Sequence, residues 1–270
     1  MSNSTPDLGR YATVLATGAG ELIRGRSGLG TVSSKSTSTD LVTEVDRATE
    51  QWLLERIATD RPDDAVLGEE GADRSGRSGI RWVVDPVDGT VNFVLGLPSY
   101  AVSVAAERDG EVVAGAVCDV VSGAVYCATV GAGAWRDDQS GSHRLTGPRV
   151  VPLDRAVVGT GFNYDRGVRE RQGQVAAQLL PRIADIRRIG SAALDLCALA
   201  AGRLDAYYEA GLNRWDAAAG ALIATEAGCV VSGLRGRGWG KHLTAAAGPE
   251  LAPEFFAELE RLGADDVGAE

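Results

Sequence analysis

The hydrophobic pattern of the chain changes at a polar, turn-rich stretch, residues 137–148. Before this stretch, short segments rich in Val, Ala and Tyr are separated by Asp-Gly and Ser-Gly dipeptides, which favour hairpin turns. After it, segments of strand length alternate with segments of helix length. The sequence therefore predicts an α/β protein in two sub-domains: an α+β half, residues 1–145, containing an antiparallel meander, and an α/β half, residues 146–270.

The spacing of apolar residues and the turn residues give the expected elements of each half. In the first half we expect helices over 8–23 and from 43–46 to just before Pro62, a loop or irregular ribbon at 27–39, strands at 66–67 and 81–84, a mobile loop at 72–80, and meander strands at 100–107, 111–118 and 123–129. In the second half we expect strands at 156–162, 186–189, 204–208, 229–232 and 243–247, and helices at 168–180, 191–201, 215–227 and 250–262.

The composition excludes several classes of function. With 27 basic and 37 acidic residues, the net charge of −10 argues against binding to nucleic acid or to an anionic membrane. The four cysteines form no Cys-x-x-Cys pair and there are only two histidines, so a zinc cluster or a Ser-His-Asp triad is not expected. No apolar run approaches the roughly 20 residues of a membrane span. We therefore expect a soluble cytoplasmic protein whose chemistry is carried by carboxylates.

The sharpest motif is the hexapeptide that runs from Asp85 to Thr90, directly after a predicted strand. Pro86 stiffens the turn and Gly89 permits a close backbone approach, so Asp85 and Asp88 can converge on divalent cations. Oxygen ligands alone suit Mg²⁺ or Mn²⁺. The backbone N–H groups of Gly89 and Thr90 would favour a phosphate at the start of the next helix. The alternative is an acidic surface turn that caps a helix.

Two similar motifs differ from this hexapeptide. An EF-hand loop needs oxygen ligands at alternate positions, and Val87 and Gly89 break that register. Aspartyl-phosphate phosphatases carry Asp-x-Asp-Gly-Thr, whereas two residues separate the aspartates here. Because the nucleophile–acid pair is missing, no phospho-enzyme is implied.

Three further acidic segments lie at predicted element ends. Glu69 and Glu70 follow a strand, Asp46 lies near the start of the second helix, and Asp216 begins a later helix. Each has a structural alternative: Asp46 and Glu69 as helix-end charges, and Asp216 as an N-terminal cap.

Taken together, these segments resemble the inositol monophosphatases, a branch of the Mg²⁺-dependent, lithium-sensitive phosphatase superfamily. The resemblance extends from Lys35 through the last strand and rests on Lys35, Asp40-Leu41-Val42-Thr43 with Asp46, Gly68-Glu69-Glu70, the stretch Trp82–Thr90 with Asn92-Phe93, Gly190-Ser191-Ala192-Ala193, and Trp215-Asp216 with Glu226-Ala227-Gly228. It implies the layered α/β/α/β/α sandwich of the inositol monophosphatase and fructose-1,6-bisphosphatase type. The chain departs from many relatives at Leu95-Gly96, where they carry His-Arg or His-Gly, and at Ser191, a common threonine.

The resemblance also implies metal ligands. Glu69, Asp85 and the backbone carbonyl of Val87 resemble the ligands of a first Mg²⁺. Asp85, Asp88 and Asp216 resemble those of a second, with Asp85 bridging the two ions. A third, weaker ion would depend on Glu69. Carboxylates gathered this closely repel one another without cations, so raised pKa values or disorder of the 68–80 loop are expected in their absence.

The remaining implied residues concern catalysis and substrate. Thr90 and Asp46 resemble the pair that orients and deprotonates the attacking water, with Glu69 nearby, and the backbone of Gly89 and Thr90 would hold the phosphate. The residues that resemble a hydroxyl-binding wall are Gly190, Ser191, Ala192 and Glu209. Lys35 and Glu70 are further candidate site residues.

The resemblance implies an activity: hydrolysis of a small polyol phosphate by in-line attack of a metal-activated water, without a phospho-enzyme. Myo-inositol 1-phosphate is the expected substrate. The alternatives are histidinol phosphate, fructose 1,6-bisphosphate and a 3′-phosphoadenosine nucleotide, which relatives hydrolyse. A homodimer is expected because family members are usually dimers. The alternative of another class is a regulatory binding protein that retains the fold.

Overall fold

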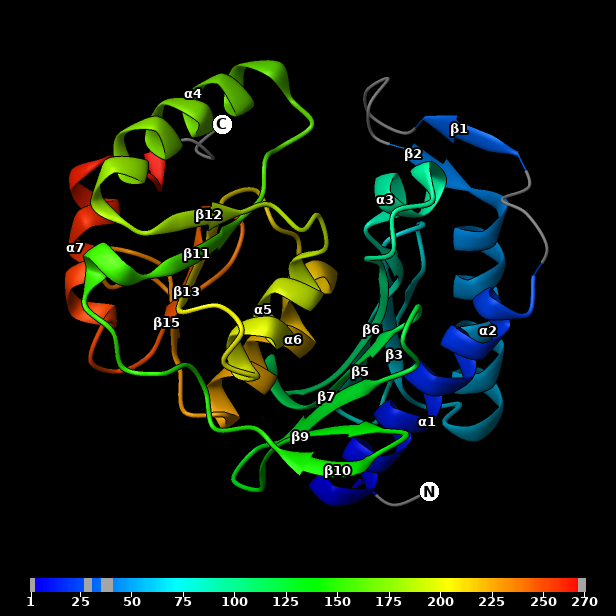
Figure 1. Ribbon diagram of the computed structural model, residues 1–270. Coiled ribbons are helices and arrows are strands. Elements are labelled where there is room, and N and C mark those ends of the chain that lie inside the picture. Colours follow the sequence, from blue (N-terminus) through cyan, green and yellow to red (C-terminus); the bar gives the residue numbers. More distant parts are fainter. Residues whose placement is uncertain (1–2, 27–30, 35–40, 267–270) are drawn as a thin grey trace.

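The computed structural model describes residues 3–26, 31–34 and 41–266, and these form five layers (Figure 1). Helices α1 (Thr5–Arg24) and α2 (Glu44–Asp60) cover one face of an eight-stranded sheet, and α5 (Ala192–Ala200) and α6 (Arg214–Glu226) cover the other. A five-stranded sheet lies beyond α5, and α4 (Arg166–Leu179) and α7 (Ala252–Arg261) cover its outer face. The expected α/β/α/β/α sandwich is confirmed.

The eight-stranded sheet belongs to the first half of the chain. Its strands, in spatial order, are β10 (Gly141–Arg144), β9 (Gly133–Asp138), β8 (Val125–Thr129), β7 (Glu111–Asp119), β6 (Ala101–Arg108), β5 (Ile80–Asp88), β3 (Ala65–Gly68) and β4 (Asp73–Arg74). Neighbours are antiparallel except β3 and β5, which are parallel, with Gly68 opposite Val84. Because these two strands run the same way, the acidic segments that follow them emerge at the same edge of the sheet.

The five-stranded sheet belongs to the second half. Its spatial order is β12 (Asp185–Arg187), β11 (Val157–Thr160), β13 (Ala206–Glu209), β15 (Thr244–Ala247) and β14 (Val230–Ser232). The first three strands are parallel, and β15 is antiparallel to both of its neighbours. The alternation of strands and helices predicted for this half is confirmed.

The expected polar junction at residues 137–148 is wrong in its first part. Strands β9 and β10 form a hairpin there and extend the sheet, with Ser142 opposite Asp137. All four residues of β10 are exposed, because it is an edge strand with no layer over either face. An edge strand of this kind has the polar composition of a loop, so the hydrophobic pattern did not reveal it.

Three shorter elements also differ from expectation. Strand β4 lies inside the predicted 72–80 loop. Strand β1 (Val32–Ser34) lies in the stretch 27–39, where a loop or irregular ribbon was expected, and pairs with β2 (Leu41–Thr43), which directly precedes α2. Strand β5 continues to Asp88 rather than ending at Val84, since its pairing with β6 shifts register between Asp85 and Asp88. This irregularity accommodates Pro86, which has no N–H to contribute to the ladder.

Small residues let α6 approach its neighbours closely. A Cβ placed on Gly115 of β7 would lie 2.9 Å from the Cα of Ala219, and one on Gly220 would lie 2.9 Å from Leu196 of α5. The Ala- and Gly-rich sequence of α6 therefore seats the helix tightly between the eight-stranded sheet and α5. This packing fixes the position of Asp216 in its first turn.

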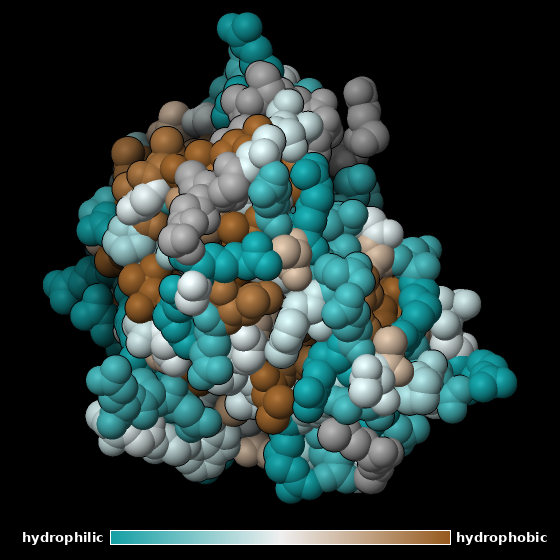
Figure 2. Space-filling model, turned by 90° about the vertical axis from the view of Figure 1, so that its right-hand side faces the viewer, coloured by the Kyte–Doolittle hydropathy of each residue, from teal (hydrophilic) through white to brown (hydrophobic). Residues whose placement is uncertain are grey.

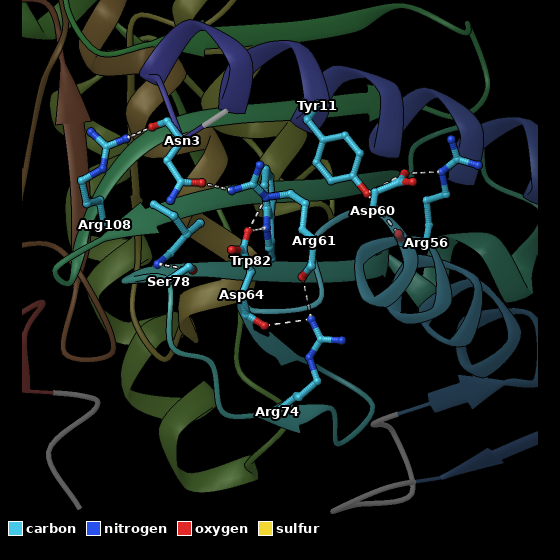
Figure 3. Close-up of polar contacts among 11 residues, drawn as sticks. Asn3, Tyr11, Arg56, Asp60, Arg61, Asp64, Arg74, Ser78, Trp82 and Arg108 are labelled. Carbon is cyan, nitrogen blue, oxygen red and sulfur yellow. Dashed lines mark hydrogen bonds and ion pairs between the residues drawn. The ribbon is translucent and has the colours of Figure 1, made fainter. Parts of the chain in front are cut away.

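A buried polar cluster joins the end of α2 to β5 (Figure 3). Arg61 forms an ion pair with Asp64, which also accepts a hydrogen bond of 2.8 Å from Trp82 Nε1. The guanidinium of Arg61 lies 5.7 Å from the centroid of the Trp82 ring. Arg74 of β4 donates to the backbone carbonyl of Asp64 at 2.8 Å. Arg74 therefore attaches the C-terminal end of the segment after β3 to the core.

Within the described ranges, no helix has both the length and the apolar character that crossing a membrane requires.

Candidate active site

A cavity of about 550 Å³ lies where segments from both halves of the chain meet. The predicted site residues that line it are Glu69, Asp85, Val87, Asp88, Gly89, Thr90, Gly190, Ser191, Ala192, Glu209 and Asp216. Asp46 and Glu70 do not line it, and Lys35 and Asp40 lie outside the described residues. The fold thus brings together side chains that are up to 147 positions apart, from Glu69 to Asp216.

Four carboxyl groups lie in this cavity, and the charges of their neighbours raise the pKa values of two of them. Burial raises the pKa of Asp85 well above its ordinary value, and the charges of Glu69, Asp88 and Asp216 raise it further. Burial likewise raises the pKa of Asp216, with Asp88 and Glu69 adding to the effect. Burial raises the pKa of Asp88 to about 6. The direction of these shifts agrees with the prediction of raised carboxylate pKa values for the three aspartates, whose charged forms are disfavoured in the absence of cations.

Two of the acids occupy the third position of a helix capping box. Asp46 Oδ2 accepts the backbone N–H of Thr43 at 2.9 Å at the start of α2. Asp216 Oδ2 accepts the backbone N–H of Asn213 at 2.7 Å at the start of α6. The capping alternative is therefore correct for both residues, but it uses one oxygen of each carboxylate. The cap fixes the orientation of the side chain and leaves Oδ1 for a second contact.

Asp88 connects the two halves of the molecule. Its Oδ2 accepts the hydroxyl of Ser191 at 2.5 Å and the backbone N–H of Ala193 at 2.8 Å, in the first turn of α5. Asn92 makes a second connection, since its Nδ2 donates to the carbonyl of Ile189 at 2.9 Å. Ser191 is buried and lines the cavity, and its hydroxyl donates to Asp88.

Thr90 lies between the cavity and a buried carboxylate. Its Oγ1 is 2.9 Å from Asp46 Oδ1 and 2.9 Å from the carbonyl oxygen of Val87. Asp46 is fully buried beneath it. Thr90 begins α3 (Thr90–Leu95), which has only six residues, so backbone N–H groups rather than a long helix dipole would attract an anion here.

The opposite wall of the cavity contains Glu209 at the end of β13. Its Oε2 accepts the hydroxyl of Tyr207 at 2.8 Å, and burial raises its pKa to about 7. Gly161 leaves space for this carboxylate, because a Cβ there would lie 2.1 Å from its oxygens. Glu209 is therefore held in place at the cavity surface.

Three residues that matter for the site were not predicted from the sequence. Arg188 and Lys241 are exposed cations that line the cavity, and Lys241 is one of two lysines in the chain, a rarity that could have singled it out. Glu50 is a buried acid of α2 that contacts the segment around Glu69. In the sequence, Glu50 could have been recognised because it follows Asp46 by one helical turn and so lies on the same face of the helix.

The model of the family described as "Inositol monophosphatase family" matches residues 8–263. The chain belongs to the inositol monophosphatase family. Membership makes it a phosphatase, in agreement with a cavity lined by carboxylates. The expectation drawn from the ordered acidic segments is confirmed.

Relatives of known name support the assignment. The inositol-1-monophosphatase SuhB of Mycobacterium tuberculosis is 48% identical over an alignment of 278 positions, which covers 96% of this chain and 96% of the relative. A solved structure of Mycobacterium tuberculosis SuhB superposes with a TM-score of 0.84 at 46% identity, covering 100% of both chains. The Nus factor SuhB of Escherichia coli K12 is 38% identical over 232 residues, or 84% of this chain and 85% of the relative.

Inositol monophosphatase family members are metal-dependent, and the donor set of this cavity has the right chemistry for a hard divalent cation. The side chains that raise one another's pKa values are carboxylates without nitrogen or sulfur donors, as Mg²⁺ and Mn²⁺ prefer. These carboxylates are gathered without being drawn into a ligand shell: in the part of the chain that the structure describes, no group of three or more acidic, His or Cys side chains is arranged to hold an ion.

Proposed function

We propose that the protein is a Mg²⁺-dependent phosphomonoesterase that hydrolyses a small polyol phosphate, with myo-inositol 1-phosphate as its preferred substrate. The observation that carries the proposal is one cavity that contains four carboxyl groups, those of Glu69, Asp85, Asp88 and Asp216, together with Thr90, which is hydrogen-bonded to the buried Asp46. Phosphate monoester hydrolysis develops negative charge on the phosphoryl oxygens and needs an activated water, and this arrangement suits both demands.

The metal ligands belong to the proposal. Glu69, Asp85 and the carbonyl of Val87 would hold one Mg²⁺, and Asp85, Asp88 and Asp216 a second, with a weaker third ion at Glu69. Mn²⁺ could take the same oxygen ligands. Bound Mg²⁺ supplies a Lewis acid that stabilises phosphoryl charge and makes water more acidic. The raised pKa values support the assignment, since carboxyl groups that repel one another gain most from a shared cation.

The protein's own residues would position and deprotonate water. With its hydroxyl hydrogen directed to Asp46 Oδ1, Thr90 Oγ1 can accept a hydrogen bond from a water in the cavity. The water proton can then pass to Thr90 Oγ1 as the hydroxyl proton passes to Asp46 Oδ1. Glu69 is a second acceptor at the same side of the cavity. Because water is the nucleophile, no covalent enzyme intermediate is needed.

The substrate would extend from these groups toward Glu209. The backbone N–H groups of Gly89 and Thr90 would bind the phosphate, and the carboxylate of Glu209 would accept two hydroxyl hydrogen bonds from a polyol ring. The wall between them would consist of the backbone at Gly190, Ser191 and Ala192. A polyol is preferred because Glu209 Oε2 already accepts the Tyr207 hydroxyl, and leaving the remaining acceptor positions of this carboxylate without hydroxyl partners costs about 1–3 kcal/mol.

The test combines substrates with two conservative variants. Phosphate release is measured with Mg²⁺ on equal concentrations of myo-inositol 1-phosphate, histidinol phosphate, fructose 1,6-bisphosphate and a 3′-phosphoadenosine nucleotide. Asp85→Asn and Asp216→Asn should abolish turnover. The control is Asp63→Asn, an exposed acid paired with Arg77, which should leave turnover unchanged. If either cavity variant keeps more than about a tenth of kcat, a loss below about 1.4 kcal/mol, the ligand assignment is wrong.

The Nus-factor relative suggests a second candidate function, a regulatory binding protein of this fold. The presence of Glu69, Asp85, Asp88, Asp216 and Thr90 in one cavity, with Asp46 hydrogen-bonded to Thr90, favours catalysis over that candidate. Turnover that disappears in Asp88→Asn would argue against a purely regulatory role. We also propose that residues 1–145 and 146–270 are the two sub-domains, and that the protein is a cytoplasmic homodimer, as is usual in this family.

A further inference from the structure

Glu50 lies at the centre of α2 and is 4% exposed, yet it has no place in the proposed chemistry. The outward side of the same helix is polar, and the face of the molecule shown in Figure 2 has hydrophilic side chains interspersed with hydrophobic patches. An acid on the opposite, buried side of the helix is therefore unexpected, because burying a carboxylate is costly unless its oxygens have hydrogen-bond partners.

The partners of Glu50 include the loop that contains Glu69. Glu50 Oε2 accepts the backbone N–H of Glu70 at 2.8 Å, and Oε1 accepts that of Ala72 at 3.2 Å. The loop closes on itself as well, since the N–H of Gly68 donates to the carbonyl of Ala72 at 2.7 Å. The segment from Gly68 to Ala72 is thus folded around one buried carboxylate, in the manner of a backbone anion nest.

Gly68 permits this arrangement. A Cβ at Gly68 would lie 2.4 Å from Glu50 Oε2 and 2.7 Å from its Cδ. The carboxylate therefore contacts the loop directly on the N-terminal side of Glu69 and binds the N–H directly on its C-terminal side. Glu50 thus binds the backbone directly after Glu69 and leaves no room for a side chain directly before it.

Helix α2 supports the cavity at two points one turn apart. Asp46 holds Thr90, at the start of α3, and Glu50 holds the loop after β3. Strands β3 and β5 are parallel neighbours. Glu50 therefore supports the segment that follows β3, and Asp46 supports the segment that follows β5. The far end of the loop is attached separately, through Arg74.

We propose that Glu50 is a positioning residue that presents Glu69 to a divalent cation, a role that rests on the proposed function. Glu50 does not line the cavity, so it acts through the backbone of residues 68–72. In Glu50→Gln, the amide keeps the size of the side chain but has one acceptor oxygen for two N–H donors, so the hydrogen bond to either Glu70 or Ala72 is lost.

The experiment measures Mg²⁺ binding to the full-length, metal-stripped protein by calorimetry, together with kcat at saturating Mg²⁺. Glu50→Gln should weaken Mg²⁺ binding at least tenfold while kcat at saturating Mg²⁺ stays within about threefold of wild type. Gly68→Ala, which pushes a methyl group against the carboxylate, should weaken binding in the same direction. The matched control is Glu55→Gln, an exposed acid of the same helix that pairs with Gln51, and it should bind as wild type does.

A double-mutant cycle separates positioning from simple stabilisation. If Glu50 acts through Glu69, then adding Glu50→Gln to Glu69→Gln should change Mg²⁺ binding less than twofold. A purely structural role would instead lower the urea midpoint of unfolding and leave the Mg²⁺ titration of the folded variant unchanged, and that result would overturn the proposal. A wild-type protein that binds no Mg²⁺ would overturn the proposed function as well. If the wild-type protein binds Mg²⁺ and Glu50→Gln binds it equally well, only the inference about Glu50 is overturned.

Discussion

Thr90 Oγ1 lies 2.9 Å from Asp46 Oδ1, although 44 residues separate the two in sequence. Asp46 is fully buried, and its other oxygen is occupied by the N-terminus of α2. Thr90, which lines the cavity, therefore connects it by a hydrogen bond to the fixed carboxylate of Asp46. This pairing can move a proton away from the cavity without placing Asp46 in contact with substrate.

Replacing Thr90 by alanine should reduce kcat about 10²–10⁴-fold, because the hydroxyl that would relay the proton is lost. The affinity for Mg²⁺, measured by calorimetry, should stay close to the wild-type value, since the proposed ligands are unchanged. Thr90→Ser keeps the hydroxyl and should retain most of the activity. Loss of Mg²⁺ binding in Thr90→Ala would show that the residue has a structural role instead.

Gly89 should tolerate a side chain less well than a glycine in an open turn. It has φ +96°, and a Cβ would lie 3.0 Å from the carbonyl oxygen of Ser99 and 3.1 Å from that of Gly190. Gly110 has φ +85° and no atom within 4 Å of such a Cβ. Gly110→Ala should therefore cost about 1–2 kcal/mol from backbone conformation alone, and Gly89→Ala clearly more.

Urea unfolding of the two glycine variants measures this difference. The excess cost of Gly89→Ala reports how closely the Asp85–Thr90 turn approaches the Gly190 segment of the other half. Equal costs for the two substitutions would mean that this close approach contributes nothing to stability.

The site was more predictable from the sequence than the sheet edges. Asp85, Asp88 and Asp216 sit at element ends, where a carboxylate next to turn residues can be recognised without knowing the fold. The β9–β10 hairpin was missed because an edge strand exposes both faces and has the composition of a loop. Glu50 was missed for a related reason: a helical acid is ordinary on a surface, and only the packing of α2 shows that it is buried.

Glu209 should make the stability of the protein fall with increasing pH. Burial raises its pKa from 4.5 to about 7, so between these values the folded protein holds a proton that the unfolded chain has lost. Stability then decreases from about pH 4.5 to about pH 7 and is level above. Glu209→Gln lacks this titration and should be more stable than wild type at pH 8, by about 2–3 kcal/mol, with little difference below pH 4.5.

Urea unfolding at pH 5 and pH 8, without divalent cations, measures the effect. The control is Glu170→Gln, an exposed acid of α4, which should change stability equally at both pH values. A difference between Glu209→Gln and wild type that does not grow with pH would contradict the buried, proton-binding state of Glu209.

Binding of Mg²⁺ should release protons from the protein. Burial raises the pKa of Asp88 to about 6, so near pH 6 this group holds part of a proton that a cation must displace, and the pKa values of Asp85 and Asp216 are shifted in the same direction. The apparent Mg²⁺ affinity should therefore rise with pH, by up to tenfold per unit for each proton released. Calorimetric titration at pH 6 in two buffers of different ionisation enthalpy counts the protons, because the observed heat then depends on the buffer. Equal heats in both buffers would mean that no proton is released, and that the pKa of Asp88 is not raised as described.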